Sequence, residues 1–241
     1  MFIIPVLESE EELRIIEDRV KSYISPGTEI DVRAIRFGTE SNETFLDEVM
    51  NAPSVAKLAR EAQYEGCDGI FIECMLDIGL EAAREVVRIP VVGPGRLSLL
   101  AAVDLEENFS IITELENTNT PFLKLVSSLG LEQKLTSIRS IDIPMLELKD
   151  RSRLEEAVLE TSLSAIRDDG AHGLVLGCTR MFGIEESVQG RLRDAGYRVP
   201  VIYGLPLGLY YLETLVRLGL SHSKRSYMDP PEKKNSLEGK L

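Results

Sequence analysis

Short apolar runs rich in β-branched residues alternate with longer amphipathic stretches along this chain. The apolar runs predict strands at 2–6, 29–35, 69–73, 90–93, 109–113, 136–140, 173–176 and 200–203. The amphipathic stretches predict helices at 10–23, 54–65, 80–87, 121–129, 153–168, 184–194 and 207–218. Alternation of strands with helices indicates an α/β fold, in which helices cover both faces of a parallel sheet. The polar stretch 36–53 is long for a connection in such a fold, which is typical of a functional loop.

An internal repeat divides the pattern into two similar halves. Residues 67–74 read CDGIFIEC and lead through a helix into IPVVG, whereas 171–178 read AHGLVLGC and lead through a helix into VPVI. In each half a glycine, Gly69 or Gly173, precedes a cysteine at the same spacing. We therefore expect two pseudosymmetric Rossmann-like or flavodoxin-like lobes with a cleft between them. The expected domains are 1–97 with 205–225 and 98–204, followed by a loose tail at 226–241.

Composition and charge exclude several classes of function. The chain has 241 residues and a formal net charge of −13, which argues against partners rich in phosphate, such as nucleic acid or an anionic membrane surface. The first residues lack the basic and long apolar regions of a signal peptide. No run of about 18 apolar residues predicts a membrane span. We therefore expect a cytoplasmic protein whose three cysteines are reduced thiols.

Two of the cysteines, Cys74 and Cys178, occupy matching places in the repeat. Each is predicted just beyond the carboxyl end of a buried strand, where open α/β sheets bind ligands, and close to the start of the next helix. A helix N-terminus lowers a thiol pKa and makes thiolate available. A thiol on each side of a small molecule suits removal of a proton from one face of a carbon and its return to the other. Three alternatives to this interpretation are that the thiols simply pack in the core, that they form a disulfide, and that they bind zinc.

The remaining candidate metal or thiol ligands fit structural roles better. Cys67 aligns with the entering end of its strand, and we interpret it as a packing residue. His172 is also at an entering end, and His222 follows the last predicted helix, where simple exposure is expected. Because neither histidine has ligand spacing to a cysteine, no metal site is predicted.

The motifs around the two cysteines resemble those of the aspartate/glutamate/hydantoin racemase family, especially its hydantoin racemase branch. Residues 176–181, LGCTRM, are similar to its Leu-Gly-Cys-Thr-Gly-Met signature, and 74–80, CMLDIGL, to its Cys-Phe-Gly-Asp-Pro-Gly-Leu segment. The resemblance implies a fold of two pseudosymmetric α/β domains, a two-base mechanism without pyridoxal phosphate or another cofactor, and a homo-oligomer. It places Cys74 and Cys178 at the catalytic positions and Thr179 where the substrate's carboxylate or carbonyl oxygen is held.

The sequence also departs from the family pattern. Residues 4–9, IPVLES, replace an Asn-Pro-Asn-Thr-like loop, and Arg180 replaces a glycine. Arg180 is interpreted either as a clamp for a substrate carboxylate or as a solvent-facing or ion-paired arginine. Ser9 and Ser41 are candidate substrate-binding residues because they follow predicted strand ends. Asp77 is a candidate for capping the next helix or for touching substrate.

The hypothesis that combines these observations is racemisation or epimerisation at a carbon beside a carbonyl group. Two alternatives stay open at this point. Related decarboxylases and cis–trans isomerases use one cysteine on the same scaffold, and two α/β lobes around a cleft also describe a small-molecule binding module. Reactive thiols near neutral pH separate an enzyme from a binder, which has no need for them.

Overall fold

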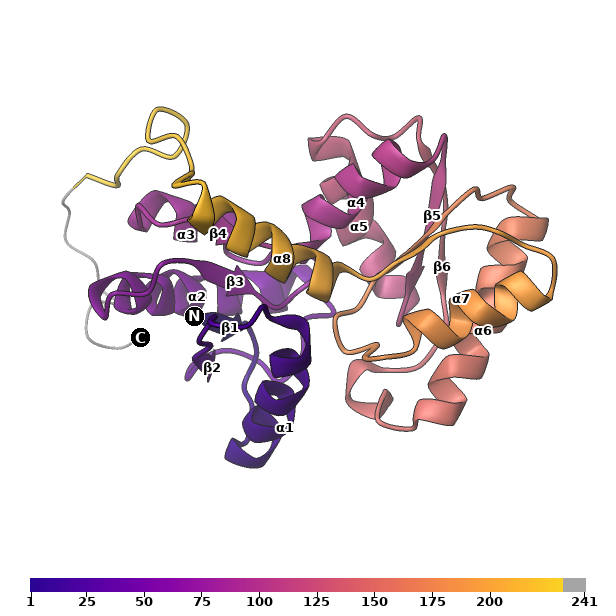
Figure 1. Cartoon of the computed structure of the whole chain (residues 1–241), viewed down its shortest axis with the longest axis horizontal. Coiled ribbons are helices and arrows are strands. Elements are labelled where there is room, and N and C mark those ends of the chain that lie inside the picture. Colours follow the sequence, from indigo (N-terminus) through magenta and orange to yellow (C-terminus); the bar gives the residue numbers. More distant parts are fainter. Residues whose placement is uncertain (232–241) are drawn as a thin grey trace. The chain divides into compact units, whose positions relative to one another are not determined.

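The computed structural model describes residues 1–231 and separates the chain into two compact units (Figure 1). Unit 1 comprises Met1–Gly93 together with the chain from Pro206 onward, and unit 2 comprises Pro94–Leu205. Within residues 1–231, none of the helices has the length and apolar composition that crossing a bilayer requires. The two units are built alike, because each contains a parallel sheet with the same strand order.

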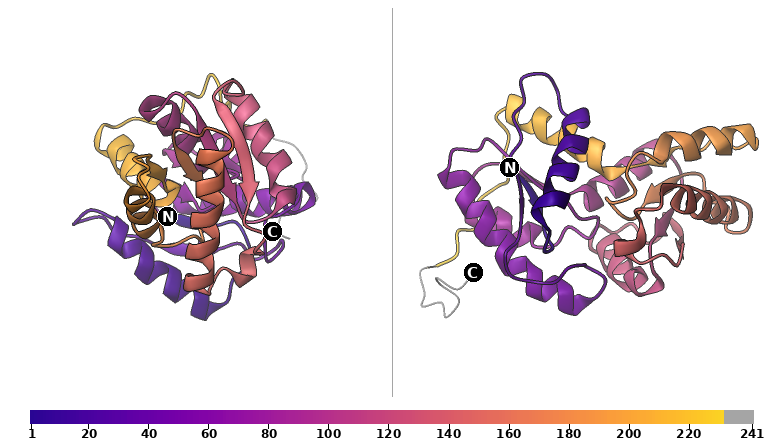
Figure 2. Two further views of the ribbon diagram at one scale, coloured as in Figure 1. Left: turned by 90° about the vertical axis from the view of Figure 1, so that its right-hand side faces the viewer. Right: turned by 90° about the horizontal axis from the view of Figure 1, so that it is seen from below.

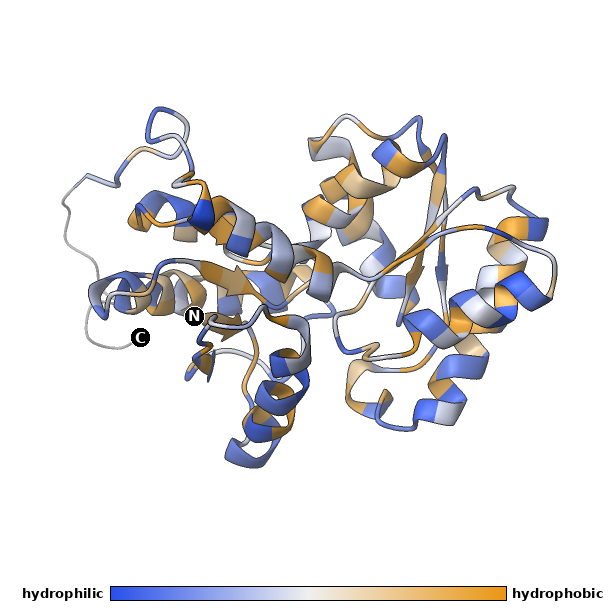
Figure 3. Cartoon of the chain, in the orientation of Figure 1, coloured by the Kyte–Doolittle hydropathy of each residue, from blue (hydrophilic) through white to orange (hydrophobic). Residues whose placement is uncertain are grey.

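Unit 1 is built on a parallel four-stranded sheet in the order β2-β1-β3-β4. Its strands and helices are β1 (Phe2–Ile4), α1 (Glu10–Val20), β2 (Val32–Ala34), α2 (Phe45–Tyr64), β3 (Ile70–Ile72), α3 (Leu80–Val86), β4 (Val91–Val92) and α8 (Gly204–Arg217). The central strands β1 and β3 are strongly apolar and fully buried (Figure 3). Continuous burial of this kind is expected for parallel strands that are covered on both faces.

Successive side chains of β3 point to opposite faces of this sheet. Ile70 and Ile72 belong to a core cluster with residues of α2 and α3. Phe71 points the other way, stacks on Phe2 with 5.2 Å between ring centroids, and lies against Gly208 of α8. A methyl group at Gly208 would lie 2.5 Å from the Phe71 ring, so glycine is what lets α8 approach the sheet this closely.

Unit 2 repeats this plan with a four-stranded parallel sheet in the order β6-β5-β7-β8. Its elements are α4 (Pro94–Leu105), β5 (Phe109–Thr113), α5 (Asn119–Ser128), β6 (Leu135–Ser140), α6 (Arg151–Arg167), β7 (Leu174–Leu176), α7 (Glu185–Asp194) and β8 (Val201–Ile202). Helices α6 and α7 lie side by side (Figures 1 and 2). The predicted α/β fold with parallel sheets is confirmed, and each predicted strand is present, β5 with the predicted ends and the others with an end shifted by one to three residues.

Two helices differ from the sequence prediction. Helix α2 begins at Phe45 rather than at residue 54, because Thr44 and Asp47 form a capping box at its N-terminus and Pro53 is accommodated inside the helix. Helix α4, which was not predicted, begins at Pro94, a residue well suited to the first turn of a helix. The predicted loop 36–53 is therefore shorter, and the sequence Gly93-Pro94-Gly95 leads into a helix rather than extending a turn.

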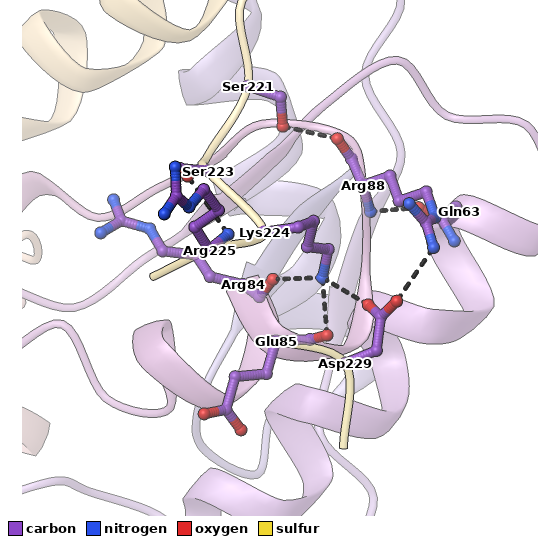
Figure 4. A network of polar contacts seen from close by, with 9 residues as sticks. All are labelled: Gln63, Arg84, Glu85, Arg88, Ser221, Ser223, Lys224, Arg225 and Asp229. Carbon is purple, nitrogen blue, oxygen red and sulfur yellow. Dashed lines mark hydrogen bonds and ion pairs between the residues drawn. The ribbon is translucent and has the colours of Figure 1, made fainter. Parts of the chain in front are cut away.

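The segment after α8 packs against α3 and β4 as far as Asp229 (Figure 4). Lys224 donates to the backbone oxygens of Arg84 and Glu85 and pairs with Asp229 at 2.9 Å. His222, expected to be simply exposed, has its Nε2 atom 3.0 Å from the backbone nitrogen of Val91. These contacts join residues far apart in the sequence, which local patterning does not reveal.

This segment overlaps the expected loose tail at 226–241. Tyr227 lies in this tail, and its hydroxyl accepts from the guanidinium of Arg84 at 3.0 Å. The Arg84 side chain is buried and also donates to the backbone oxygen of Val91. The part of the tail up to Asp229 is therefore not loose, because ion pairs and this hydrogen bond hold it to unit 1. Residues 232–241 lie outside the described part of the chain.

The carboxylate of Glu106 in unit 2 is buried beside Gly173, just before β7, and we expect it to make stability depend on pH. Glu106 follows α4, and both of its carboxylate oxygens are buried without a hydrogen-bond partner within residues 1–231. They lie against Gly173, where a methyl group would be 1.7 Å from Oε1. Burial raises the pKa of Glu106 from 4.5 to about 7, because the charged form loses its hydration.

We expect Glu106→Gln to change how the free energy of unfolding depends on pH. Since the folded-state pKa of Glu106 lies above its unfolded value, the contribution of this group to stability is full below about pH 4.5 and is lost as the pH rises through 7. The variant lacks this fall, so it should be more stable than the parent at pH 8 and similar to it at pH 5. Urea unfolding at both pH values measures the difference. Glu107→Gln is the control, because Glu107 is exposed and pairs with Lys134; an equal gain in both variants at pH 8 would contradict the assignment.

Candidate active site

The first cysteine of the repeat, Cys74, stands at the carboxyl end of β3 and opens a tight turn. Its backbone oxygen accepts from the N–H of Asp77 at 3.0 Å, and its side chain is partly exposed. A second turn follows and ends at Gly79, whose φ of +73° is readily adopted by glycine. Helix α3 then begins at Leu80.

Cys178 opens the same kind of turn after β7 in unit 2. Its backbone oxygen accepts from the N–H of Met181 at 3.2 Å, and its side chain is 7% exposed. A second turn again ends at a glycine of positive φ, Gly183 at +66°, and α7 begins at Glu185. Gly79 and Gly183 stand at the same spacing after their cysteines, a signal in the sequence that extends the repeat beyond the motifs first recognised.

The turns correct one expectation about the cysteines. Neither thiol lies at the start of the next helix, because two turns separate Cys74 from α3 and Cys178 from α7. Each cysteine therefore belongs to a turn rather than to the first turn of a helix. Neither cysteine is in a disulfide within the described residues, and both lie at the carboxyl edge of a parallel sheet, the edge at which α/β folds bind their ligands.

Close packing explains the residue that precedes Cys178. Gly177 donates its N–H to the oxygen of Ile112 in β5 at 2.7 Å. A methyl group at this position would lie 2.9 Å from that same oxygen, so only glycine fits without displacement. In unit 1 the matching residue is Glu73, which is buried and donates its N–H to the oxygen of Ile3 in β1. Both cysteines are thus carried directly on the central strand pair of their sheet.

Thr179 and Arg180 form the middle of the turn that Cys178 opens. Thr179 is 3% exposed, and its backbone oxygen accepts from the hydroxyl of Tyr203 at 2.6 Å. Arg180 is partly buried. Tyr203 comes directly after β8 and was not identified from the sequence, because its contact depends on the pairing of β7 with β8.

Three further candidates have local partners in unit 1. Ser9 caps α1, since its hydroxyl oxygen accepts from the N–H of Glu12. The backbone oxygen of Ser41 accepts from the hydroxyl of Thr39. Asp77 does not cap α3 with its side chain, because that helix begins after Gly79 and no side chain caps it; its carboxylate lies against Gly93 instead. Substrate binding by these three residues stays a prediction.

A buried amide organises the loop that follows β2. Asn51, on α2, is fully buried and accepts from the N–H of Thr39 at 2.7 Å, while its own amide group donates to Thr39 and Asn42. Asn42 in turn donates to the oxygen of Pro5, just beyond β1. The loop is thereby tied to the carboxyl edge of the unit 1 sheet, close in sequence to Ser41. Sequence reasoning missed Asn51, because residue 51 fell within the predicted loop.

The remaining ligand-type residues take structural positions. Cys67 packs against the core cluster of unit 1, in agreement with its interpretation as a packing residue. The backbone N–H of His172 donates to the side chain of Asn108. Within residues 1–231, no three side chains of His, Cys, Asp or Glu are grouped so that they could hold a metal ion.

Comparisons with known proteins agree on one group of enzymes. The family model of Asp/Glu/hydantoin racemases matches residues 7–210. A hydantoin racemase of Pseudomonas sp. (strain NS671) is 33% identical over 220 residues, which cover 91% of this chain and 86% of that protein. One from Rhizobium meliloti is 36% identical over 185 residues, covering 76% of this chain and 75% of the relative. The structure of an allantoin racemase from Klebsiella pneumoniae superposes with a TM-score of 0.88 at 32% identity and covers 99% of this chain and 97% of its own.

Proposed function

Since the chain belongs to the Asp/Glu/hydantoin racemase family, we propose that it racemises a carbon atom beside a carbonyl group in a hydantoin or an amino-acid-like substrate. Relatives named hydantoin racemase and allantoin racemase support a substrate with a hydantoin ring, because both names refer to such compounds. The α-hydrogen of a hydantoin is more acidic than that of a free amino acid, so a thiolate is a strong enough base to remove it.

Cys74 and Cys178 are the proposed acid and base. One sulfur, as thiolate, takes the α-proton, and the electron pair of the broken C–H bond moves into the carbonyl group to form an enolate. The other sulfur, as thiol, gives its proton to the opposite face of the same carbon, and the electron pair returns from the oxygen. The charge on the two sulfurs is then exchanged, so the enzyme is ready to run the reaction in the reverse direction.

The observation that carries this proposal is the matched construction of the two cysteine turns. Each begins at the carboxyl end of the third strand of its unit. In each, the backbone N–H of the third residue after the cysteine donates to the cysteine's backbone oxygen. The second turn then ends at a glycine of positive φ. If a cysteine served only for packing in one unit, the other unit would have no need of the same arrangement. Two acid–base groups that exchange roles do give such a reason.

Polar groups beside Cys178 are the proposed partners of the substrate oxygen. An enolate oxygen is stabilised by hydrogen-bond donors that are already fixed in place before the reaction. Thr179 belongs to a turn that a buried hydrogen bond holds, which meets this requirement. Arg180 follows it and is proposed to contact a carbonyl or carboxylate oxygen of the substrate through its guanidinium. The homo-oligomeric state implied by the family stays a prediction.

Hydrogen exchange in deuterated water tests the proposed reaction. A single enantiomer of a 5-substituted hydantoin is incubated with the protein, while polarimetry follows the optical rotation and NMR follows the α-hydrogen. We expect the rotation to fall to zero and deuterium to enter the α-position of the inverted product. Unchanged rotation and an unlabelled α-carbon, with hydantoins and amino acids alike, would rule out the proposal. Carbon dioxide release from a disubstituted malonate without any racemisation would favour the decarboxylase alternative.

A further inference from the structure

In each unit the residue that follows the fourth strand in the chain touches the turn that carries the cysteine. In unit 2 this residue is Tyr203, which comes directly after β8 and is 4% exposed. Its hydroxyl donates to the backbone oxygen of Thr179 at 2.6 Å. This hydrogen bond is buried, and it ends on the peptide group between Thr179 and Arg180, in the middle of the turn that Cys178 opens.

In unit 1 the corresponding residue is Gly93, which comes directly after β4. Here the contacting side chain belongs to the turn, whereas in unit 2 it belongs to the residue after the strand. A methyl group at Gly93 would lie 2.2 Å from Oδ1 and 2.7 Å from Cγ of Asp77, so the carboxylate occupies the space that any other residue's side chain would need. Asp77 is the residue whose N–H closes the turn on Cys74.

The backbone of Asp77 depends on this contact. Its φ of +53° lies in the left-handed region, which is unfavourable for a residue with a side chain. The side chain is 5% exposed, and the backbone oxygen accepts from the N–H of Leu80 at the start of α3. A conformation of this kind persists only where the surrounding structure holds it. The packing of the Asp77 carboxylate against Gly93 is one such contact.

We propose that Tyr203 and Asp77 are positioning residues that fix the two cysteine turns against the neighbouring strands β8 and β4. The inference rests on the proposed function in one respect: positioning matters for racemisation only if both thiols act on the substrate. Displacement of a reacting group by about 1 Å can reduce a rate on the order of 100-fold, so a contact that holds the turn controls the proton transfer. For Asp77 this role is the alternative to direct contact with substrate.

The variant Tyr203→Phe tests the unit 2 contact, because it removes one hydroxyl and keeps the ring. We expect kcat for hydantoin racemisation to fall on the order of 10- to 100-fold, with KM changed by less than about threefold. Without the bond, the turn loosens and its polar groups hold the Cys178 thiolate less well. The pH profile for alkylation of Cys178 by iodoacetamide, read by peptide mass spectrometry, should therefore move to higher pH. The profile of Cys74 should not move.

The control for this variant is Tyr197→Phe. Tyr197 lies in the same unit, and its hydroxyl accepts from Arg167 at 3.0 Å, with no contact to either cysteine turn. It should leave both alkylation profiles and kcat unchanged. A Tyr203→Phe enzyme with the parent's kcat and the parent's Cys178 profile would overturn the proposal for unit 2.

Asp77 and Gly93 are tested as a pair. Asp77→Asn keeps the shape and should move the Cys74 profile alone, whereas Asp142→Asn, at an exposed aspartate whose φ is +54°, should move neither. Gly93→Ala should disturb the Cys74 turn by displacing the carboxylate. Adding Asp77→Gly frees that space, so the double variant should recover the thermal stability that Gly93→Ala loses, without recovering kcat.

The outcomes separate this inference from the proposed function. An Asp77→Asn variant with a raised KM and an unchanged kcat would indicate substrate contact and overturn positioning for this residue. If the double variant were no more stable than Gly93→Ala, the carboxylate would not be packed tightly against residue 93. That result would overturn the proposed contact in unit 1. The alkylation profiles need no substrate, so they decide the positioning claim even if no hydantoin is racemised.

Discussion

Replacing either Cys74 or Cys178 by serine should lower kcat for racemisation by on the order of a thousandfold or more, in both directions of the reaction. General acid–base groups typically contribute about 10²- to 10⁴-fold to a rate. A serine hydroxyl stays protonated near neutral pH, so it cannot take over from the thiolate as base. Because the proposed mechanism uses one thiol as base and the other as acid in each turnover, the loss of either one should stop inversion. Polarimetry on both enantiomers measures the effect.

The single-cysteine variants should retain one partial reaction. The remaining thiolate can still remove the α-proton from one enantiomer and return a deuteron to the same face. NMR in deuterated water should therefore show exchange without inversion, in opposite enantiomers for the two variants. Cys67→Ser is the matched control, since Cys67 packs against the core cluster of unit 1 and its replacement should leave racemisation intact. Full inversion by Cys74→Ser or by Cys178→Ser would contradict the two-thiol mechanism.

The largest effect on stability is expected for Phe71→Ala. The ring is 1% exposed, stacks on Phe2 and lies against Gly208 of α8, so its removal leaves a cavity between the sheet and this helix. Replacing a buried phenylalanine by alanine typically costs about 3–5 kcal/mol. Since the free energy of unfolding of a protein is usually about 5–15 kcal/mol, the variant should lose a large part of its stability.

Urea unfolding followed by circular dichroism measures this loss. Phe71→Leu should lose much less, because leucine fills most of the same space. Tyr64→Ala is the control at the surface, since Tyr64 is 92% exposed at the end of α2 and its change should be within about 0.5 kcal/mol. A loss below about 1 kcal/mol for Phe71→Ala would show that α8 does not depend on this ring.

The strands could be predicted because their surroundings are simple. A parallel strand covered on both faces must be apolar at nearly every position, which makes β1, β3 and β7 visible in the sequence. Helices α2 and α4 differed from the prediction, because the first part of α2 is polar and α4 starts directly at Pro94 after a short strand. The capping box at Thr44 was a usable signal that was not recognised.

The candidate site divides in the same way. The cysteines and Thr179 could be found from a repeat, because both halves of the chain have the same pattern around them. Asn51 could not, since it fell within the predicted loop, and Tyr203 could not, since its hydroxyl bonds a backbone oxygen 24 residues away. The helix starts after the cysteines were predicted to within one residue, at 80 and 184, but the two turns that separate each cysteine from its helix were not.

The sequence by itself determined the α/β class, the two-fold repetition and the two thiols at matching places. Apolar runs and repeated motifs can be recognised from neighbouring residues in the chain. Only the tertiary structure decided what holds each thiol in place. The space at Gly93 that the Asp77 carboxylate fills, and the oxygen of Thr179 that the Tyr203 hydroxyl reaches, exist only after strands distant in the chain have paired. Contacts between such strands depend on register and distance in three dimensions, which no local pattern contains.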